Sequence, residues 1–301
     1  MLSTLMIFVC HFLQGLSNDW AYIFNIGVQL FFLISGFLYG KKGVVKVDGF
    51  IKSRFGKVYL PYIVFFAIVV IAYQVFDVCR ISPKTIVFYL LNLQGFSALL
   101  PTPIEGLNHL WFLTILMICY GITPFVHCFL KKHKVLFFMS LVLLIIVECV
   151  FLRKLYSVFI CVLVYLTGLL YGKYEEKVPR WIFLLPVPFL IMILLQGKSL
   201  EGLMANTYGY IWFKFLLSVS GFCFLYFLLS AMKITGNKVI AIADNYSYEF
   251  YLIHHVFILG PFSLMTVARN ISLSLLIIVL VTSCLAYVLK KLTVPIAKKI
   301  L

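Results

Sequence analysis

The stretch VYLPYIVFFAIVVIAYQVF, residues 58–76, contains no charged side chain. A helix needs about 20 predominantly apolar residues to cross a bilayer, so this run predicts a transmembrane helix. Nine other apolar runs give the same prediction, at 1–17, 24–40, 107–127, 135–151, 156–172, 181–196, 209–231, 245–262 and 271–289. The sequence therefore predicts an all-α fold, a polytopic membrane bundle of about ten transmembrane helices.

Composition supports a membrane protein. Of the 301 residues, 63% are hydrophobic and 12% are charged, and the mean hydropathy is +1.09. Soluble domains are nearer half apolar and a quarter charged. We expect one integrated membrane domain over residues 1–301, with membrane lipid as a partner. The net charge of +15 does not indicate nucleic acid here, because cationic loops are a normal feature of membrane proteins.

The distribution of Lys and Arg predicts the topology. If the 41–57 stretch is a cytoplasmic loop, 18 of the 25 Lys and Arg residues fall on the cytoplasmic side and six on the other. This asymmetry follows the positive-inside rule. It predicts a multi-pass protein of the cytoplasmic, or inner, membrane with both termini in the cytoplasm.

The sequence lacks the motifs of several enzyme classes. Its eight cysteines are scattered without a CxxC pair, and there is no HExxH, GxSxG or Gly-rich phosphate loop. The cysteines are typical of small packing residues rather than disulfides or metal ligands. We expect no metal.

The first predicted helix carries a polar face. Thr4, His11, Gln14 and Asn18 follow one another at spacings of 7, 3 and 4 residues, which places them on one side of a helix. Polar groups at bilayer depth are costly and usually face a partner or a cavity. The face is either a hydrogen-bonded strip between helices or part of a water-accessible site that includes His11.

The ninth predicted helix opens with DNYSYEFYLIHH, residues 244–255. Tyr251 and His254 lie three residues apart, and His255 lies four beyond Tyr251, so all three share a face. The tyrosines are also typical of an interfacial aromatic belt. In that interpretation Asp244 or Asn245 would cap the start of the helix.

Two further groups of residues stand at the ends of predicted helices. His109 and Trp111 begin the fourth helix, where Trp is often a belt residue. Arg54 and Lys57 lie three residues apart at the start of the third helix. They serve either to orient the protein and bind anionic lipid or to hold the phosphates of a cytosolic ligand.

Together these segments resemble acyltransferase family 3, the bacterial O-acetyltransferases of cell-surface polysaccharides. The resemblance runs along essentially the whole chain. Its motifs are His11 near the end of the first helix, NIGVQLFFLISGFLYG at 25–40 with Ser35 and Gly36, FIKSRFGKVYLP at 50–61 with Arg54, Lys57 and Pro61, HLWFL at 109–113, and SYEFYLIH at 247–254.

The resemblance implies transfer of an acetyl group, or another short acyl group, from cytosolic acetyl-CoA or a similar acyl-CoA to a hydroxyl of a cell-surface or lipid-linked carbohydrate. His11 would then be the catalytic base, since imidazole accepts protons near neutral pH; the alternative role is that of a transient acyl carrier. Arg54 and Lys57 would bind the phosphates of CoA. The carbohydrate pocket would be formed by Trp111, His109, Tyr251 and His254.

The chain departs from the family pattern in three places. The usual arginine about ten residues before the helix-1 histidine would fall before Met1, Gln29 stands where an Asp is frequent, and Lys57 replaces the second of two arginines. The first helix is also short for a bilayer. Either the bilayer thins at this helix, or residues that precede Met1 are missing from the sequence; the second alternative also accounts for the absent arginine.

Two rival interpretations use the same residues. A transporter or flippase could move a polysaccharide or lipid-linked sugar without chemistry, with Trp111 and Tyr251 along the sugar path. An inactive relative could serve as a scaffold. Acetyl esters on the glycan would distinguish the enzyme from both.

Overall fold

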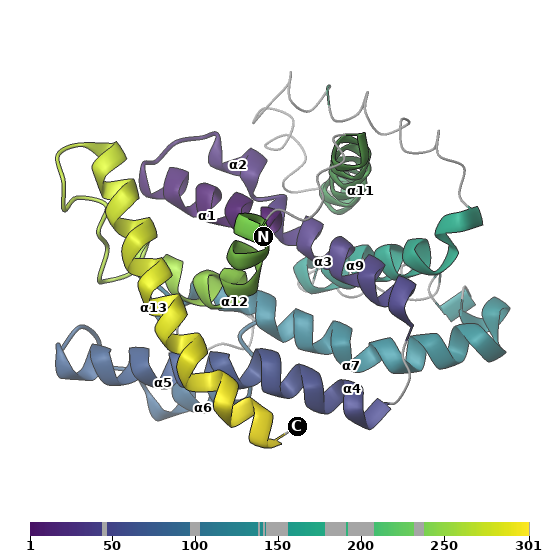
Figure 1. The fold of residues 1–301 in the computed structure, drawn as a ribbon, viewed down its shortest axis with the longest axis horizontal. Helices are drawn as coiled ribbons and strands as arrows, with labels where there is room; N and C mark the ends of the chain where they lie inside the picture. Colours follow the sequence, from purple (N-terminus) through teal and green to yellow (C-terminus); the bar gives the residue numbers. More distant parts are fainter. Residues whose placement is uncertain are drawn as a thin grey trace. The chain divides into compact units, whose positions relative to one another are not determined.

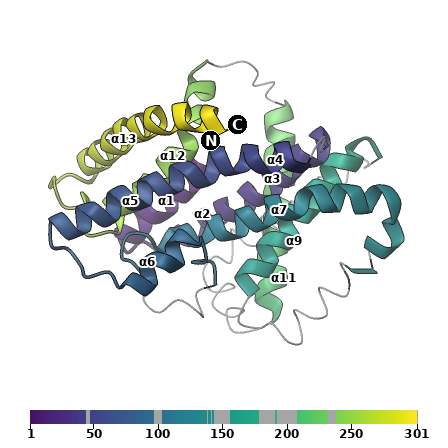
Figure 2. The same cartoon turned by 90° about the horizontal axis from the view of Figure 1, so that it is seen from below.

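The computed structural model describes residues 1–43, 47–96, 103–137, 139–140, 142, 156–177, 191, 208–231 and 238–300. All regular structure within these ranges is helical (Figures 1 and 2). The predicted helices at 135–151 and 181–196 lie largely outside them. The elements are α1 (Leu2–Gly15), α2 (Ala21–Phe24), α3 (Gly27–Lys42), α4 (Val47–Arg54), η1 (Phe55–Tyr59), α5 (Leu60–Val75), α6 (Pro83–Leu90), η3 (Asn108–Leu110), α7 (Trp111–Lys132), α9 (Tyr156–Tyr174), η5 (Glu175–Lys177), α11 (Tyr208–Ala231), α12 (Lys238–Ile258) and α13 (Ile271–Ile300).

Four stretches of the described chain are long and apolar enough to cross a membrane. They are Val47–Val75, Asn108–Lys132, Val158–Lys177 and Ile271–Lys299. These four agree with predicted spans. The total of ten spans and the cytoplasmic location of both termini stay predictions.

The described chain forms two compact units. The first contains Met1–Ala21, Val47–Met117 and Asn237–Leu301, and the second contains Tyr22–Lys46 and Ile118–Gly236. Helix α7 begins in the first unit and continues into the second. The single integrated domain stays a prediction.

In the first unit, α12 packs against α1, α5 and α13 (Figure 1). Phe8 and Phe12 of α1 form a buried apolar cluster with Ile258 of α12 and Ile278 of α13. The Phe8 ring also lies 5.4 Å from the Phe250 ring, centroid to centroid, in an edge-to-face arrangement. Aromatic packing thus holds the C-terminal half of α1 against α12.

Several helices extend beyond their predicted boundaries. The basic stretch 41–57, expected as a loop, contains α4, which runs through the π-helical turn η1 into α5 without a break. Helix α12 begins at Lys238, so Asp244 and Asn245 lie inside it and do not cap its start. Helix α13 continues beyond the predicted run 271–289, through a lysine-rich stretch, to Ile300. Lys and Arg are good helix formers, so the helix continues through the basic residues of α4 and of the end of α13.

In the second unit, the glycines of the 25–40 motif allow close packing of α3 against α9. A Cβ added at Gly36 would lie 2.0 Å from the Tyr165 carbonyl oxygen, and one at Gly168 would lie 2.1 Å from the Leu33 carbonyl oxygen. Gly40 and Gly172 show the same contacts one turn further along. Glycines spaced by four on both α3 and α9 let the two backbones touch, as in close helix pairs of membrane proteins.

Candidate functional site

Four histidines of the first unit come together from three separate segments. His11 lies on α1, His109 in η3, and His254 and His255 on α12. The His255 ring centroid is 4.6 Å from that of His11 and 4.6 Å from that of His109. The His254 centroid is 5.4 Å from the same two rings. We call these four residues the histidine cluster.

Helix α12 supplies half of the cluster because of its register. Tyr251, His254 and His255 share one buried face of the helix. His254 is fully buried, and His255 is 5% exposed. Two titratable rings at this depth are costly without partners, so their hydrogen bonds decide what they can do.

A sharp turn before η3 brings His109 and a backbone acceptor to the cluster. Gly106 has a φ of +77°, a backbone conformation that residues other than glycine rarely adopt. A Cβ there would also lie 2.9 Å from the Gly260 Cα. The Gly106 carbonyl accepts a hydrogen bond from His255 Nδ1 at 3.0 Å. The glycine therefore permits both the turn and the close approach that this bond needs.

Segment η3 and helix α12 are joined by reciprocal hydrogen bonds. The Tyr251 hydroxyl donates to the His109 carbonyl at 2.7 Å, and His109 Nε2 donates to the Leu252 carbonyl at 3.2 Å. The Tyr251 ring also lies 5.2 Å from the His109 ring and 5.1 Å from the Phe112 ring. Tyr251 thus positions His109 within the cluster.

The hydrogen bonds define which ring nitrogen carries the proton in each neutral histidine. His11 Nδ1 lies 2.8 Å from Gln14 Oε1, and His254 Nδ1 lies 2.7 Å from the Tyr251 carbonyl. Carbonyl oxygens only accept, so these nitrogens donate, as do His109 Nε2 and His255 Nδ1. The opposite nitrogen of each ring keeps a lone pair. Among the described residues, His109 Nδ1 and His254 Nε2 are buried without a hydrogen-bond partner.

The basic pair lies outside the histidine cluster. Arg54 ends α4 and is half-buried, whereas Lys57 in η1 is exposed. The Tyr248 hydroxyl donates to the Val58 carbonyl at 2.6 Å, which ties η1 to α12. Tyr248 precedes His254 by six residues, or about 9 Å along a helix. The basic pair and the cluster therefore stand at different levels of the same unit.

Two predicted features have a smaller part in the site. Trp111 begins α7 and is half-buried, and its ring makes none of the cluster's contacts within the described chain. Helix α1 ends at Gly15, so Asn18 is not on the predicted polar face. The Asn18 side chain instead accepts a hydrogen bond from the Trp20 backbone in the following turn.

His255 was missed as a site residue although it lies at the centre of the cluster. The pattern from Tyr251 to His255 placed it on the right face of α12, yet the family motif ends at His254. Its contacts with Gly106 and His11 join segments far apart in sequence. The doubled histidine in a buried helix was the signal that could have found it.

The cluster is not arranged as a metal site. Within the described residues, no group of three or more His, Cys, Asp or Glu side chains has a geometry that could hold a metal ion. The nearby Glu249 is buried, and its carboxylate faces the Lys290 ammonium of α13 at 3.6 Å. Glu249 thus has a structural ion-pair partner, and the absence of a metal cofactor stays a prediction.

Comparison with known proteins connects this site to a family. A family model described as an acyltransferase domain matches residues 1–291. No curated protein and no solved structure matches the chain. The family match includes all four histidines and the basic pair.

Proposed function

The chain belongs to acyltransferase family 3, and on that premise we propose that it is an O-acyltransferase of the cytoplasmic membrane. It transfers an acetyl group, or another short acyl group, from cytosolic acyl-CoA to a hydroxyl of a cell-surface or lipid-linked carbohydrate. The family supplies acyl transfer. The donor and the acceptor are inferred from the site.

The observation that carries the acceptor is the set of lone pairs in the histidine cluster. Each imidazole uses its N–H on a carbonyl oxygen, so each offers only an acceptor to a ligand when neutral. A ligand that satisfies this set must bring several donors. A carbohydrate brings several hydroxyl donors, which complement acceptors on four rings whose centroids lie 4.6–6.4 Å apart.

The catalytic step assigns a role to His11. A sugar hydroxyl is a weak nucleophile and needs a base within hydrogen-bond reach. Gln14 accepts from His11 Nδ1, so Nε2 is the basic nitrogen. It takes the hydroxyl proton as the hydroxyl oxygen bonds to the thioester carbon. The C–S bond then breaks, and the imidazolium returns the proton to the leaving sulfur. The products are an ester and free CoA.

The donor site follows from charge. Arg54 and Lys57 are one turn apart in the basic first part of the continuous helix Val47–Val75. A guanidinium binds phosphate oxygens bidentately, and an ammonium adds a point charge. CoA phosphates bound there would lie beside Tyr248, toward the start of α12 from His254. The thioester of the same CoA would then lie in the same unit as the histidine cluster.

The test is made in the source cell. After deletion of the gene, acetyl esters on envelope carbohydrate are measured by mass spectrometry, with the wild-type gene or a variant restored. We expect His11→Ala to lower ester formation about 100- to 10,000-fold, the usual contribution of a general base. His133→Ala is the matched control, because His133 is exposed and lies outside the cluster.

Protein abundance in the membrane is measured in parallel for both variants. Normal ester content with a well-expressed His11→Ala variant would remove His11 from the mechanism. Unchanged ester content on every glycan after gene deletion would remove O-acetylation itself and favour a transport or scaffold role.

A further inference from the structure

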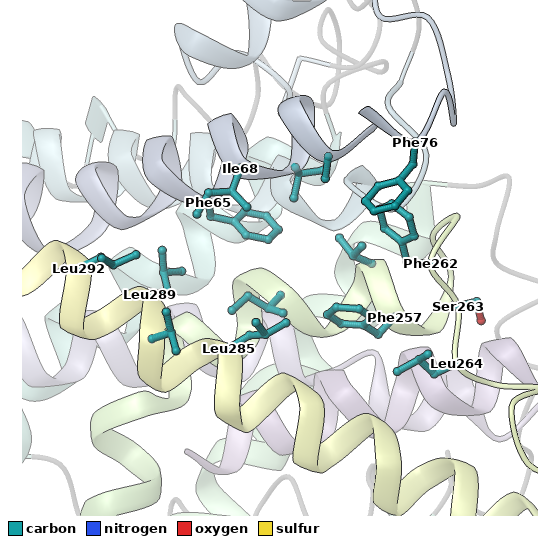
Figure 3. Close-up of a pocket in the computed structure, with 15 residues that line it drawn as sticks. Phe65, Ile68, Phe76, Phe257, Phe262, Ser263, Leu264, Leu285, Leu289 and Leu292 are labelled. Carbon is teal, nitrogen blue, oxygen red and sulfur yellow. The ribbon is translucent and has the colours of Figure 1, made fainter. Parts of the chain in front are cut away.

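A large apolar cavity lies in the same unit as the histidine cluster. It has a volume of about 610 Å³ and lies between α5, α12, α13 and the 262–264 loop (Figure 3). Of the 15 lining residues, Ser263 alone has a polar side chain. The Ser263 hydroxyl already donates to the Ile258 carbonyl at 2.8 Å. This lining offers nothing to phosphate, amide or sugar groups, and it suits a hydrocarbon chain.

Helix α12 is shared by the cavity and the cluster. Ile253 and Val256 line the cavity, and His254 and His255 lie between them in sequence. The helix ends at Ile258, about one turn beyond His255. The cavity and the cluster therefore occupy neighbouring positions on the same turns of α12.

The cavity extends away from the basic pair. Along the continuous helix Val47–Val75, its lining begins at Phe65, about 12 Å beyond Lys57, and reaches Phe76, about 28 Å beyond it. At the far end the Phe76 ring packs edge-on against the Phe262 ring at 5.7 Å (Figure 3). A donor held by its phosphates at Lys57 enters from the opposite end, which leaves this cavity for the acceptor.

The cavity also opens at the surface of membrane-spanning helices. Among its lining side chains, Ile68 is 49% exposed, Val288 48% and Leu292 51%. Hydrocarbon chains of a bilayer can therefore reach it from the side. Its volume is far larger than an acetyl group needs. It lies within the range of about 300–1,000 Å³ that is usual for cavities that bind small ligands.

We propose that this cavity holds the hydrocarbon chain of a lipid-linked carbohydrate, which presents its sugar hydroxyl to the histidine cluster. The inference rests on the proposed acyl transfer and narrows its acceptor to a glycan still attached to a lipid. The cavity is then a binding site that selects the acceptor by its chain.

The first experiment measures binding without acyl transfer. The probe is dodecyl β-glucoside with a diazirine in its chain, cross-linked to the protein in phosphatidylcholine nanodiscs and mapped by peptide mass spectrometry. We expect labelling of the α5 and α13 segments that line the cavity, also in the His11→Ala variant. Val288→Trp should lower this labelling about tenfold. The Trp side chain would keep about two methylene groups of the probe out of the apolar cavity, and the lost burial weakens binding by about that factor.

Val75→Trp is the matched control. Val75 is an exposed valine, 72% exposed, on a membrane-spanning helix outside the cavity lining. It should leave the labelling unchanged. If Val288→Trp does not fold, Leu285→Trp fills the same cavity from the same helix.

Two competitors distinguish the sources of a chain. Excess unlabelled dodecyl glucoside should prevent labelling. Stronger competition by dodecanoyl-CoA would assign the cavity to the donor, and equal labelling by a diazirine phosphatidylcholine would assign it to bulk lipid. Either result overturns the proposal.

The second experiment connects the cavity to the reaction in the source cell. Restoring Val288→Trp to the deletion strain should leave glycan ester content at least about tenfold below that with Val75→Trp. Blocked labelling with normal esterification would overturn the lipid-linked acceptor. If the wild-type protein is labelled by the probe but forms no glycan esters, the proposed acyl transfer is refuted instead. Failure of the cavity proposal and failure of the proposed function thus give different results.

Discussion

The glycine contacts between α3 and α9 predict a sharp response to the smallest substitution. In Gly36→Ala the added Cβ would lie 2.0 Å from the Tyr165 carbonyl oxygen, whereas real Cβ atoms essentially never come within 3.0 Å. The helices must therefore separate by about 1 Å at this point. The same holds for Gly168→Ala, where the distance to the Leu33 oxygen is 2.1 Å.

Both obstructing atoms belong to backbone, so no side chain can rotate away to relieve the contact. Overpacking of this kind costs about 1–3 kcal/mol. For a unit of this size, each kcal/mol lowers the Tm by roughly 2–4 °C, which gives an expected decrease of about 2–12 °C. The assay is thermal unfolding of the purified protein in detergent, followed by size-exclusion chromatography of the remaining soluble fraction.

Gly121→Ala is the control in the same unit. Gly121 lies on α7, and an added Cβ there meets no atom of the described residues within 4 Å. Replacing a helical glycine by alanine there gains up to about 1 kcal/mol of helix propensity, so its Tm should stay equal or rise. Equal Tm values for Gly36→Ala and Gly121→Ala would refute the packing explanation. Lost activity at an unchanged Tm would instead indicate that the 25–40 motif takes part directly in the reaction.

Two further outcomes are expected. Arg54→Gln or Lys57→Gln should raise the KM for acetyl-CoA roughly ten- to a hundredfold, since a charge-assisted hydrogen bond contributes about 1.5–3 kcal/mol. Lys52→Gln is the control and should leave the KM unchanged, because Lys52 is exposed on α4. Equal small effects of the three substitutions would mean that this stretch only orients the protein in the membrane. In a cysteine-depleted background, Gly49→Cys should resist an impermeant thiol reagent applied outside the cell, whereas Lys84→Cys should react; the reverse pattern would invert the predicted topology.

The sequence predicted the apolar runs well because lipid exposure and helix length leave a direct trace in composition. The run at 58–76 lies within the continuous helix Val47–Val75, and 209–231 agrees closely with α11, Tyr208–Ala231. Helix ends were harder to predict. A hydropathy pattern reports where lipid-compatible residues stop, while backbone hydrogen bonding continues through charged residues, as at the lysine-rich end of α13.

The candidate site was only partly predictable, for a physical reason. Periodicity relates residues within one helix, so it placed Tyr251 and His255 on one face. It cannot relate α1 to η3 or to α12, because those contacts depend on tertiary packing. The family motifs named His11, His109 and His254 as site residues, and the structure brings these together. The bond from His255 to Gly106 joins α12 to the turn before η3, and periodicity within one helix cannot predict such a contact.

The geometry of the first unit favours chemistry at one point over passage of a sugar along a path. A sugar path needs polar groups along its length, because each hydroxyl that leaves water must find a partner. The histidine cluster gathers four acceptors within a few ångströms, and the cavity on the neighbouring face of α12 is lined by hydrocarbon. A sugar moving from the cluster into that cavity would lose its hydrogen bonds. In the proposed arrangement, a lipid chain in the cavity with its sugar at the cluster would keep both groups satisfied and would hold one hydroxyl beside one base, as acyl transfer requires.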